Sequence, residues 1–319
     1  MTLQPGRFGA IDIGTVTCRM LIADVLSDGS VQDVERAYTI VNLGEDVDAT
    51  GVLKESAIAR AEDAIKNYLC LAKEQEVAYG RSIPIIAMAT SAARDAQNGT
   101  DFIKRIEQLG VRLIIIPGER EAELSFAGVS SSFPYEQIAV VDIGGGSTEV
   151  IVGQAGGRVL RAHSFDVGCR RVTEKFFFAD PPTEEEISQA RTWIRETMQP
   201  FFAELAGEGA VPDKVVCVAG TATTVVSIRE EMVVYDTKRV HGARVSRQDV
   251  DLVEQKLAAL PTAQRAEVVG LDPGRAPVII AGMLILQTVM DLFDVSEFVV
   301  SESDILQGIV LAEAHGEVL

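Results

Sequence analysis

The chain has 319 residues, of which 47% are hydrophobic and 24% are charged, and its formal net charge at pH 7 is −18. This length predicts two domains of about 120 to 180 residues, and this composition is typical of folded α/β proteins and excludes a disordered chain. The negative charge argues against nucleic-acid binding, which requires a basic face to displace counterions from the phosphates. A polyanionic ligand would need arginines and a metal ion gathered locally.

The ends of the chain and its cysteines predict a cytoplasmic protein with no membrane partner. The first residues lack a cationic segment, an uninterrupted apolar run and a cleavage site, so we expect no export signal. The longest uncharged run, 276–290, is shorter than the roughly 20 residues of a spanning helix and predicts a buried core helix. The four cysteines and three histidines form no metal-binding pattern, which favours reduced, structural cysteines.

Two similar segments begin the two halves of the chain, at residues 9–15 and 140–148. In each, an apolar run ends in Asp-Ile-Gly and is followed by a small polar turn and a second apolar run. A further turn follows, at 28–29 in the first copy and at 156–157 in the second. This pattern predicts an antiparallel meander of three strands at the start of each half.

Helices and strands are predicted to alternate after each meander. The first half continues with a helix at 56–76, a strand at 83–89, a helix at 101–109, a strand at 111–116 and a helix from about 119. In the second half, a capping box at Thr183 with Glu186 opens a helix before a strand at 215–219, and Ser246 with Asp249 marks another helix after that strand. We place the crossing between the halves in the helix at 119–130.

The two Asp-Ile-Gly turns have the chemistry of a phosphate site. Glycines allow a sharp turn whose N–H groups can face phosphate oxygens, and the aspartate can hold a hydrated divalent cation. A plain hairpin turn is the alternative for one copy, but two copies at matching places favour the site. A third glycine turn, Gly220 with Thr221, follows a strand and opens a helix. Walker A and dinucleotide-binding glycine patterns are both missing from the sequence.

Ten motifs occur in the order that one protein family shows. They are residues 11–15, 89–94, 117–122, 142–149, 168–174, 180–183, 220–221, 240–242, 275–276 and 300–302. On these motifs the chain resembles, over nearly its whole length, the exopolyphosphatase and guanosine pentaphosphate phosphohydrolase family of the actin-like superfamily. The resemblance implies an α/β fold with two actin-like, ribonuclease-H-like domains around an interdomain cleft. Domain I would comprise 1–123 plus about 304–319, and domain II 124–303.

The resemblance also implies the roles of individual residues. Glu121 and Glu149 would be catalytic and would orient the attacking water, and Asp142 and Glu149 would hold Mg²⁺ or Mn²⁺. The sequence alone leaves two alternatives: Glu121 on a solvated acidic helix face with Glu119 and Glu123, and Glu149 exposed on a strand. The residues expected to bind phosphate are Asp12, Gly14, Thr15, Arg19, Arg94, Gly144, Gly145, Gly146, Ser147, Thr148, Gly220, Thr221 and Arg275.

Polyphosphate is the substrate that the resemblance implies first, with release of terminal orthophosphate. The alternatives are hydrolysis of guanosine pentaphosphate, a non-catalytic sensor that binds polyphosphate or guanosine penta- or tetraphosphate, and an ATP-dependent kinase. A homodimer agrees with the resemblance, although the sequence has no diagnostic interface stripe. His241 is expected to be a buried structural residue. Three positions depart from the family pattern: Val16 replaces a polar residue, Asp304 a glycine and Leu306 an arginine.

Overall fold

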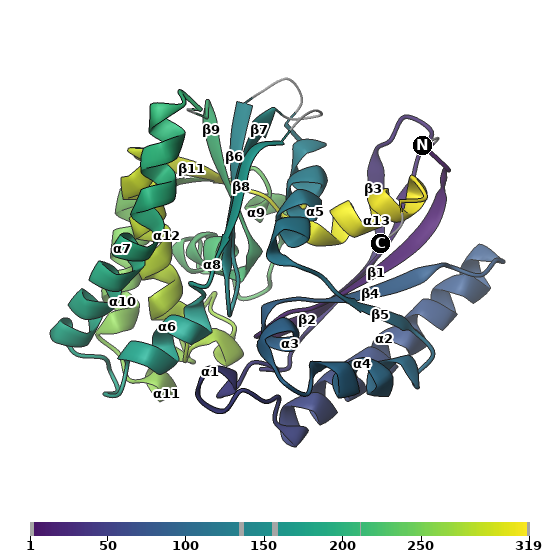
Figure 1. The fold of residues 1–319 in the computed structure, drawn as a ribbon, viewed down its shortest axis with the longest axis horizontal. Coiled ribbons are helices and arrows are strands. Elements are labelled where there is room, and N and C mark those ends of the chain that lie inside the picture. Colours follow the sequence, from purple (N-terminus) through teal and green to yellow (C-terminus); the bar gives the residue numbers. More distant parts are fainter. Residues whose placement is uncertain (1–2, 134–136, 155–158, 211, 318–319) are drawn as a thin grey trace. The chain divides into compact units, whose positions relative to one another are not determined.

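The computed structural model describes residues 3–133, 137–154, 159–210 and 212–317. Contacts within the chain divide it into two units, Met1–Ser131 with Asp304–Leu319, and Ser132–Ser303. This division assigns the whole helix that follows residue 117 to the first unit, whereas the sequence placed the boundary at 123. Each unit combines one sheet with helices (Figure 1). The turn predicted at 156–157 lies outside the described residues.

The first unit contains a sheet of five strands in the order β3-β2-β1-β4-β5. Its strands are β1 (Gly6–Ile13), β2 (Thr17–Val25), β3 (Val31–Ile40), β4 (Ile85–Ala89) and β5 (Arg112–Ile115). The first three are antiparallel, so the predicted meander is confirmed, while β1, β4 and β5 are parallel. Parallel neighbours need helical crossovers, which explains the alternation of helix and strand after the meander.

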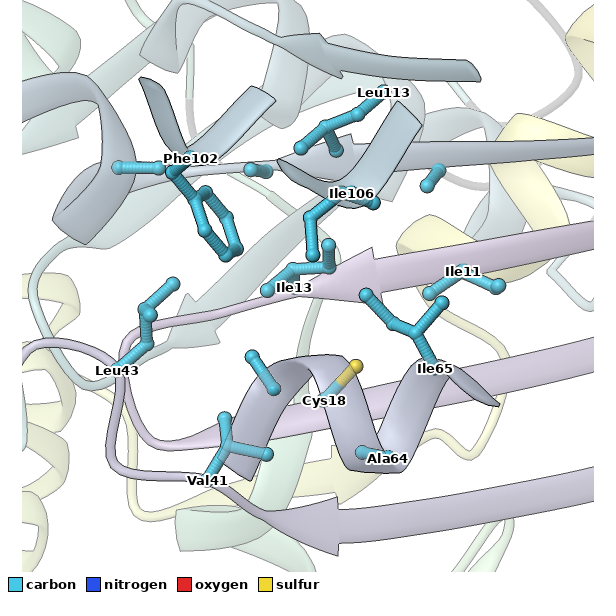
Figure 2. Packing of buried hydrophobic residues seen from close by; sticks show 14 of the residues in the cluster. Ile11, Ile13, Cys18, Val41, Leu43, Ala64, Ile65, Phe102, Ile106 and Leu113 are labelled. Carbon is cyan, nitrogen blue, oxygen red and sulfur yellow. The ribbon is translucent and has the colours of Figure 1, made fainter. Parts of the chain in front are cut away.

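Helices cover both faces of this sheet. They are α1 (Val47–Thr50), α2 (Glu55–Tyr79), α3 (Ser91–Asp95), α4 (Gly99–Glu107), α5 (Gly118–Ser130) and α13 (Ile305–Ala314). Figure 2 shows Ile11 and Ile13 of β1 in one apolar cluster with Ile65 of α2 and Ile106 of α4. The residue preceding Ile11, Ala10, packs instead with residues of α5 and α13. Because side chains alternate along a strand, Asp12 lies on the α5 and α13 face.

The second unit repeats the strand order of the first. Its strands are β6 (Gln137–Ile143), β7 (Thr148–Gln154), β8 (Val159–Phe165), β9 (Lys214–Val218), β10 (Arg244–Ser246) and β11 (Glu297–Val300). The order is β10-β11-β9-β6-β7-β8, in which β6, β7 and β8 form the predicted antiparallel meander and β6, β9 and β11 are parallel. Among the described strands, the edge strand β10 is the one without a counterpart in the first sheet, so both units have the expected actin-like α/β topology.

The second unit contains the helices predicted at Thr183, at Ser246 and in the apolar run, together with several more. They are α6 (Cys169–Phe176), α7 (Glu184–Gly207), α8 (Ala219–Arg229), α9 (Thr237–Val240), α10 (Arg247–Ala258), α11 (Thr262–Arg265), η1 (Pro273–Arg275) and α12 (Ile279–Phe293). The predicted capping box is present at the start of α7, and Ser246 with Asp249 forms a second one at the start of α10. The predicted core helix is α12, which is buried from its first residue to Met290. Within the described ranges, no helix is long and apolar enough to span a membrane.

Helices α5 and α13 approach each other so closely that only glycine fits at two positions. A Cβ atom on Gly128 would lie 1.9 Å from the carbonyl oxygen of Asp304, and a Cβ on Gly308 would lie 1.9 Å from that of Leu124. Neither backbone can move away without moving its whole helix. This contact places the C-terminal helix in the first unit.

We predict that Gly308→Ala destabilises the protein by about 1–3 kcal/mol, because the added methyl group would overlap the backbone of α5. The measurement is urea unfolding followed by circular dichroism. Gly207→Ala is the matched control, since its Cβ would meet nothing within 4 Å and alanine favours a helix. Equal unfolding midpoints for the two variants would contradict the close contact.

Candidate functional site

The first Asp-Ile-Gly turn is closed by its own backbone. The N–H of Gly14 donates to the carbonyl oxygen of Thr17 at 2.9 Å. The loop after β3 supports the turn from outside, where the N–H of Gly44 donates to the carbonyl of Thr15 at 2.9 Å. A Cβ on Gly44 would lie 2.3 Å from the Thr15 side chain, so this support also requires glycine. The N–H of Gly14 therefore shapes the turn.

The second turn is closed and supported in the same way. The N–H of Gly144 donates to the carbonyl of Ser147 at 3.0 Å. The segment after β8 again supplies the support, because the first N–H groups of α6 donate to the turn: Cys169 to Gly144 at 2.9 Å and Arg170 to Gly145 at 2.8 Å. The carbonyls of the turn thereby satisfy the free donors of a helix start, and their positions are fixed.

Two contacts that support the second turn could not be predicted from the sequence. A Cβ on Gly168 would lie 2.3 Å from the carbonyl oxygen of Gly145, and the Arg171 side chain donates to the carbonyl of Gly146 at 2.9 Å. Residues 168–174 were recognised only as a shared motif. Their physical role is to hold the triple-glycine turn, which a one-dimensional pattern does not show.

The two hairpins place different charge pairs at one equivalent position. Asp12 lies directly opposite Arg19 in the β1–β2 ladder, and Asp142 lies directly opposite Glu149 in the β6–β7 ladder. Directly opposed residues share one face of a sheet. The first pair forms an ion pair of 2.6 Å, whereas the second brings two carboxylates side by side.

Asp12 and Glu149 are both held in place by neighbours. Burial raises the pKa of Asp12, and the adjacent Arg19 guanidinium opposes that shift. Glu149 is only 1% exposed and accepts a hydrogen bond of 2.6 Å from the Ser164 hydroxyl. The alternative interpretation of Glu149 as an exposed strand residue is therefore wrong.

Arg19 contacts a second carboxylate in addition to Asp12. Its Nη1 atom pairs with Oδ2 of Asp304, the residue that caps α13. The other carboxylate oxygen of Asp304 accepts from the N–H of Leu306 at 2.9 Å. Two of the three departures from the family pattern thus lie in the cap of one helix.

Glu121 is buried in the first turn of α5. Its exposed fraction is 8%, whereas Glu119 and Glu123 on the same helix are exposed. The solvated-face interpretation is therefore wrong for Glu121 and holds for its two neighbours. Arg94 Nη1 lies 3.4 Å from Glu121 Oε2 and donates to the carbonyl of Ile116 at 3.0 Å. A helix start and a guanidinium both stabilise the ionised carboxylate.

Gly220 lies beneath the guanidinium of Arg275. A Cβ on Gly220 would be 1.8 Å from Arg275 Nη1, so the two residues are in direct contact. The sequence predicted a glycine turn before a helix, but α8 begins directly after β9, at Ala219, and Gly220 lies in its first turn. Ala219 makes this abrupt junction with a φ of +63°, a conformation that favours glycine. Thr221 lies against Gly282 of α12.

A buried arginine, Arg265, was not identified from the sequence, and it fixes the backbone on both sides of Arg275. The guanidinium of Arg265 is 2% exposed and donates to the carbonyl oxygens of Leu257 at 3.0 Å, Leu260 at 2.8 Å and Ala276 at 2.7 Å. Three charge-assisted bonds to backbone leave this segment little freedom. Arg275 therefore extends from a rigid support.

His241 corrects one expectation. It is exposed and not buried, and its Nδ1 accepts a hydrogen bond of 3.1 Å from the N–H of Glu302. The apolar residue before it, Val240, is the buried one. The three residues 240–242 thus contribute a backbone contact at the surface of the second unit.

Asp142 and Glu149 fit a hydrated divalent cation. In the described part of the chain, His, Cys, Asp and Glu form no group of three or more that could hold a metal ion. Mg²⁺ usually binds one or two carboxylates and completes its shell with water and substrate phosphate oxygens. Two carboxylates opposed on one sheet face match that donor set and do not match a closed structural zinc site.

The structure brings the predicted residues together in four groups. They are Asp12, Gly14, Thr15 and Arg19 at the first turn, Arg94 with Glu121, Asp142 with Gly144, Gly145, Gly146, Ser147, Thr148 and Glu149 at the second turn, and Gly220, Thr221 and Arg275. The first two groups belong to the first unit and the last two to the second. Within each unit, carboxylates and arginines lie beside glycine turns.

Comparisons with known proteins support one family. Residues 21–317 match the profile of the Ppx/GppA phosphatase family. Exopolyphosphatase 2 of Mycobacterium tuberculosis is 38% identical over 326 residues, which cover 97% of this chain and 98% of the relative.

Solved structures give the same result. An exopolyphosphatase from Cytophaga hutchinsonii has a TM-score of 0.87 at 26% identity, covering 98% of this chain and 99% of the other. An Aquifex aeolicus member of the Ppx/GppA family has a TM-score of 0.78 at 28% identity and covers 98% of each chain. The fit extends over both units of the fold, and so the chain belongs to the Ppx/GppA phosphatase family.

Proposed function

We propose that this protein is an exopolyphosphatase, which releases terminal orthophosphate from inorganic polyphosphate by attack of water on the terminal phosphorus. The observation that carries the proposal is the buried carboxylate of Glu121, held at the start of α5 beside Arg94. A relative named exopolyphosphatase that is 38% identical over nearly the whole chain supports it. A cytoplasmic location and Mg²⁺ or Mn²⁺ as the metal are part of the proposal.

Glu121 is the general base in this mechanism. Its carboxylate accepts a proton from the attacking water as the new bond between oxygen and phosphorus forms, while the bridging phosphorus–oxygen bond breaks and the shortened chain leaves with the bridging oxygen. Arg94 orients that carboxylate and limits its rotation. A base that is fixed before the substrate arrives needs little reorganisation during the reaction.

The substrate phosphates are bound by the glycine turns and by Arg275. The start of α8 offers backbone N–H groups and a positive helix end, and the Arg275 guanidinium lies over Gly220 at that start. A planar guanidinium can donate two parallel hydrogen bonds to one phosphate. The held triple-glycine turn adds further backbone donors.

Asp142 and Glu149 would hold the divalent cation. When bound, the metal supplies positive charge that offsets the charge of the phosphoryl oxygens. Glu149 is oriented toward this role by the Ser164 hydroxyl. The local arginines and the metal together resolve the conflict between a polyanionic substrate and a net charge of −18.

We predict that Glu121→Gln lowers kcat for phosphate release by about 10²- to 10⁴-fold, because the amide cannot accept the proton from water. The measurement is orthophosphate released from short polyphosphate, long polyphosphate and guanosine pentaphosphate with Mg²⁺. Glu119→Gln removes an exposed carboxylate from the same helix turn and should retain full activity. Faster release from guanosine pentaphosphate than from either polyphosphate would reassign the substrate; no release from any of them would refute a hydrolase.

We predict that Asp142→Asn raises the Mg²⁺ concentration for half-maximal activity by roughly tenfold or more, because the site loses one of its two charges. Asp213→Asn is the control, since Asp213 is exposed and adjoins the opposite end of β9. The measurement is phosphate release during titration with Mg²⁺ and with Mn²⁺. An unchanged metal requirement in Asp142→Asn would place the metal elsewhere.

We predict that Gly220→Ala raises KM by about tenfold with little change in thermal stability, because the methyl group displaces the flexible end of Arg275. Arg275→Gln should give a similar KM, and the double variant should be no worse than either single variant. The measurement is steady-state kinetics with short polyphosphate, together with thermal unfolding. A KM in the double variant that is higher than in either single variant would show that Gly220 and Arg275 act independently.

A further inference from the structure

The side chain of Arg19 lies between two carboxylates. Its Nη2 and Nε atoms contact Oδ2 of Asp12 at 2.6 and 3.1 Å, and its Nη1 atom pairs with Oδ2 of Asp304. The exposed fractions of the three side chains are 19% for Arg19 and 6% for each aspartate. With both carboxylates ionised, this triad of Asp12, Arg19 and Asp304 has a net charge of −1 in a mostly buried environment, where charges are weakly screened.

The charge of Asp304 is not needed for its local structural role. Asp304 caps α13 through Oδ1, which accepts from the N–H of Leu306, and the N–H of Asp304 donates to Oε1 of Gln307 at 2.9 Å. Asparagine caps helices as well as aspartate does. The cap uses Oδ1 and does not need the negative charge. Among the described residues, the recorded contact of the other oxygen, Oδ2, is the ion pair with Arg19.

We propose that Asp304 is an affinity-determining residue that masks Arg19, because its carboxylate occupies the Nη1 donor that a substrate phosphate would use. The inference rests on the proposed function, since a polyanionic substrate is the ligand that Arg19 would bind. A phosphate that approaches Arg19 must displace Asp304 and meets a triad with a net negative charge. Asp304 thereby keeps the affinity for polyphosphate lower than the arginine alone would allow.

A purely structural role for the same ion pair makes the opposite prediction. If Asp304 only anchored α13 to β2, removing its charge would lower stability and weaken binding. If Asp304 masks Arg19, removing its charge frees a donor and strengthens binding. Gain and loss of affinity therefore separate the two roles, and a gain cannot result from misfolding.

The experiment compares Asp304→Asn with the unmodified protein. Calorimetry gives the Kd of inorganic tripolyphosphate without divalent metal, and phosphate release with Mg²⁺ gives KM and kcat. We expect Kd and KM to fall by roughly three- to tenfold, with a smaller change in kcat, because asparagine keeps the cap and removes the competing charge. An unchanged or higher Kd in a variant with normal thermal unfolding would overturn the proposal.

Asp24→Asn is the matched control. Asp24 forms a two-bond ion pair with Arg7, at 2.8 Å for each bond, at the far end of the same β1–β2 hairpin. Removing its charge changes the net charge of the protein equally and should leave Kd unchanged. A gain equal to that of Asp304→Asn would attribute the effect to net charge and overturn masking.

A double-mutant cycle tests whether Asp304 acts through Arg19. In an Arg19→Gln background the freed donor is missing, so Asp304→Asn should give no gain in Kd. A gain that persists there would show a through-space charge effect and refute masking. If the proposed function itself is wrong, the experiment gives a different result. The unmodified protein and every variant would then neither bind tripolyphosphate nor release phosphate.

Discussion

The chemistry of this protein depends on one geometric constraint, that directly opposed residues of an antiparallel strand pair share a face of the sheet. The fold uses this hairpin twice, and each copy places an aspartate at the end of its first strand. The opposite residue decides what the aspartate can do. Arginine at position 19 makes an ion pair, and glutamate at position 149 makes a pair of carboxylates suited to a cation. One backbone plan thus gives two electrostatic environments.

Glycines convert that plan into a fixed site. Each turn is closed by a glycine N–H and supported by the segment after its third strand, where Gly44 or Gly168 allows close approach. A larger residue at either support would push the turn away from its sheet. The same requirement recurs between α5 and α13, where Gly128 lets the helix that bears Glu121 pack closely against the helix that Asp304 caps. Backbone proximity therefore positions the carboxylates.

Local patterns predicted most elements of the fold, because strand alternation, helix periodicity and capping boxes are encoded within a few residues. They could not predict contacts that join distant residues, such as Arg19 with Asp304 or Arg265 with the backbone around it. Glu121 is instructive, since residues 119, 121 and 123 looked alike as a charge cluster. Successive helix residues are 100° apart, so Glu121 lies about 200° from each of the other two and can be buried while they are solvated.

The arginines expected to bind phosphate are all engaged by the protein itself. Arg94 contacts Glu121, Arg19 contacts two aspartates, and Arg275 lies on the backbone of Gly220. These contacts differ in their consequence for an anionic ligand. The guanidinium of Arg275 lies against an uncharged glycine backbone, whereas that of Arg19 lies between two carboxylates and must exchange partners before it binds a phosphate. An acidic protein can therefore bind a polyanion with an affinity that its own carboxylates adjust. The carboxylate nearest to each arginine determines how strongly that arginine attracts the ligand.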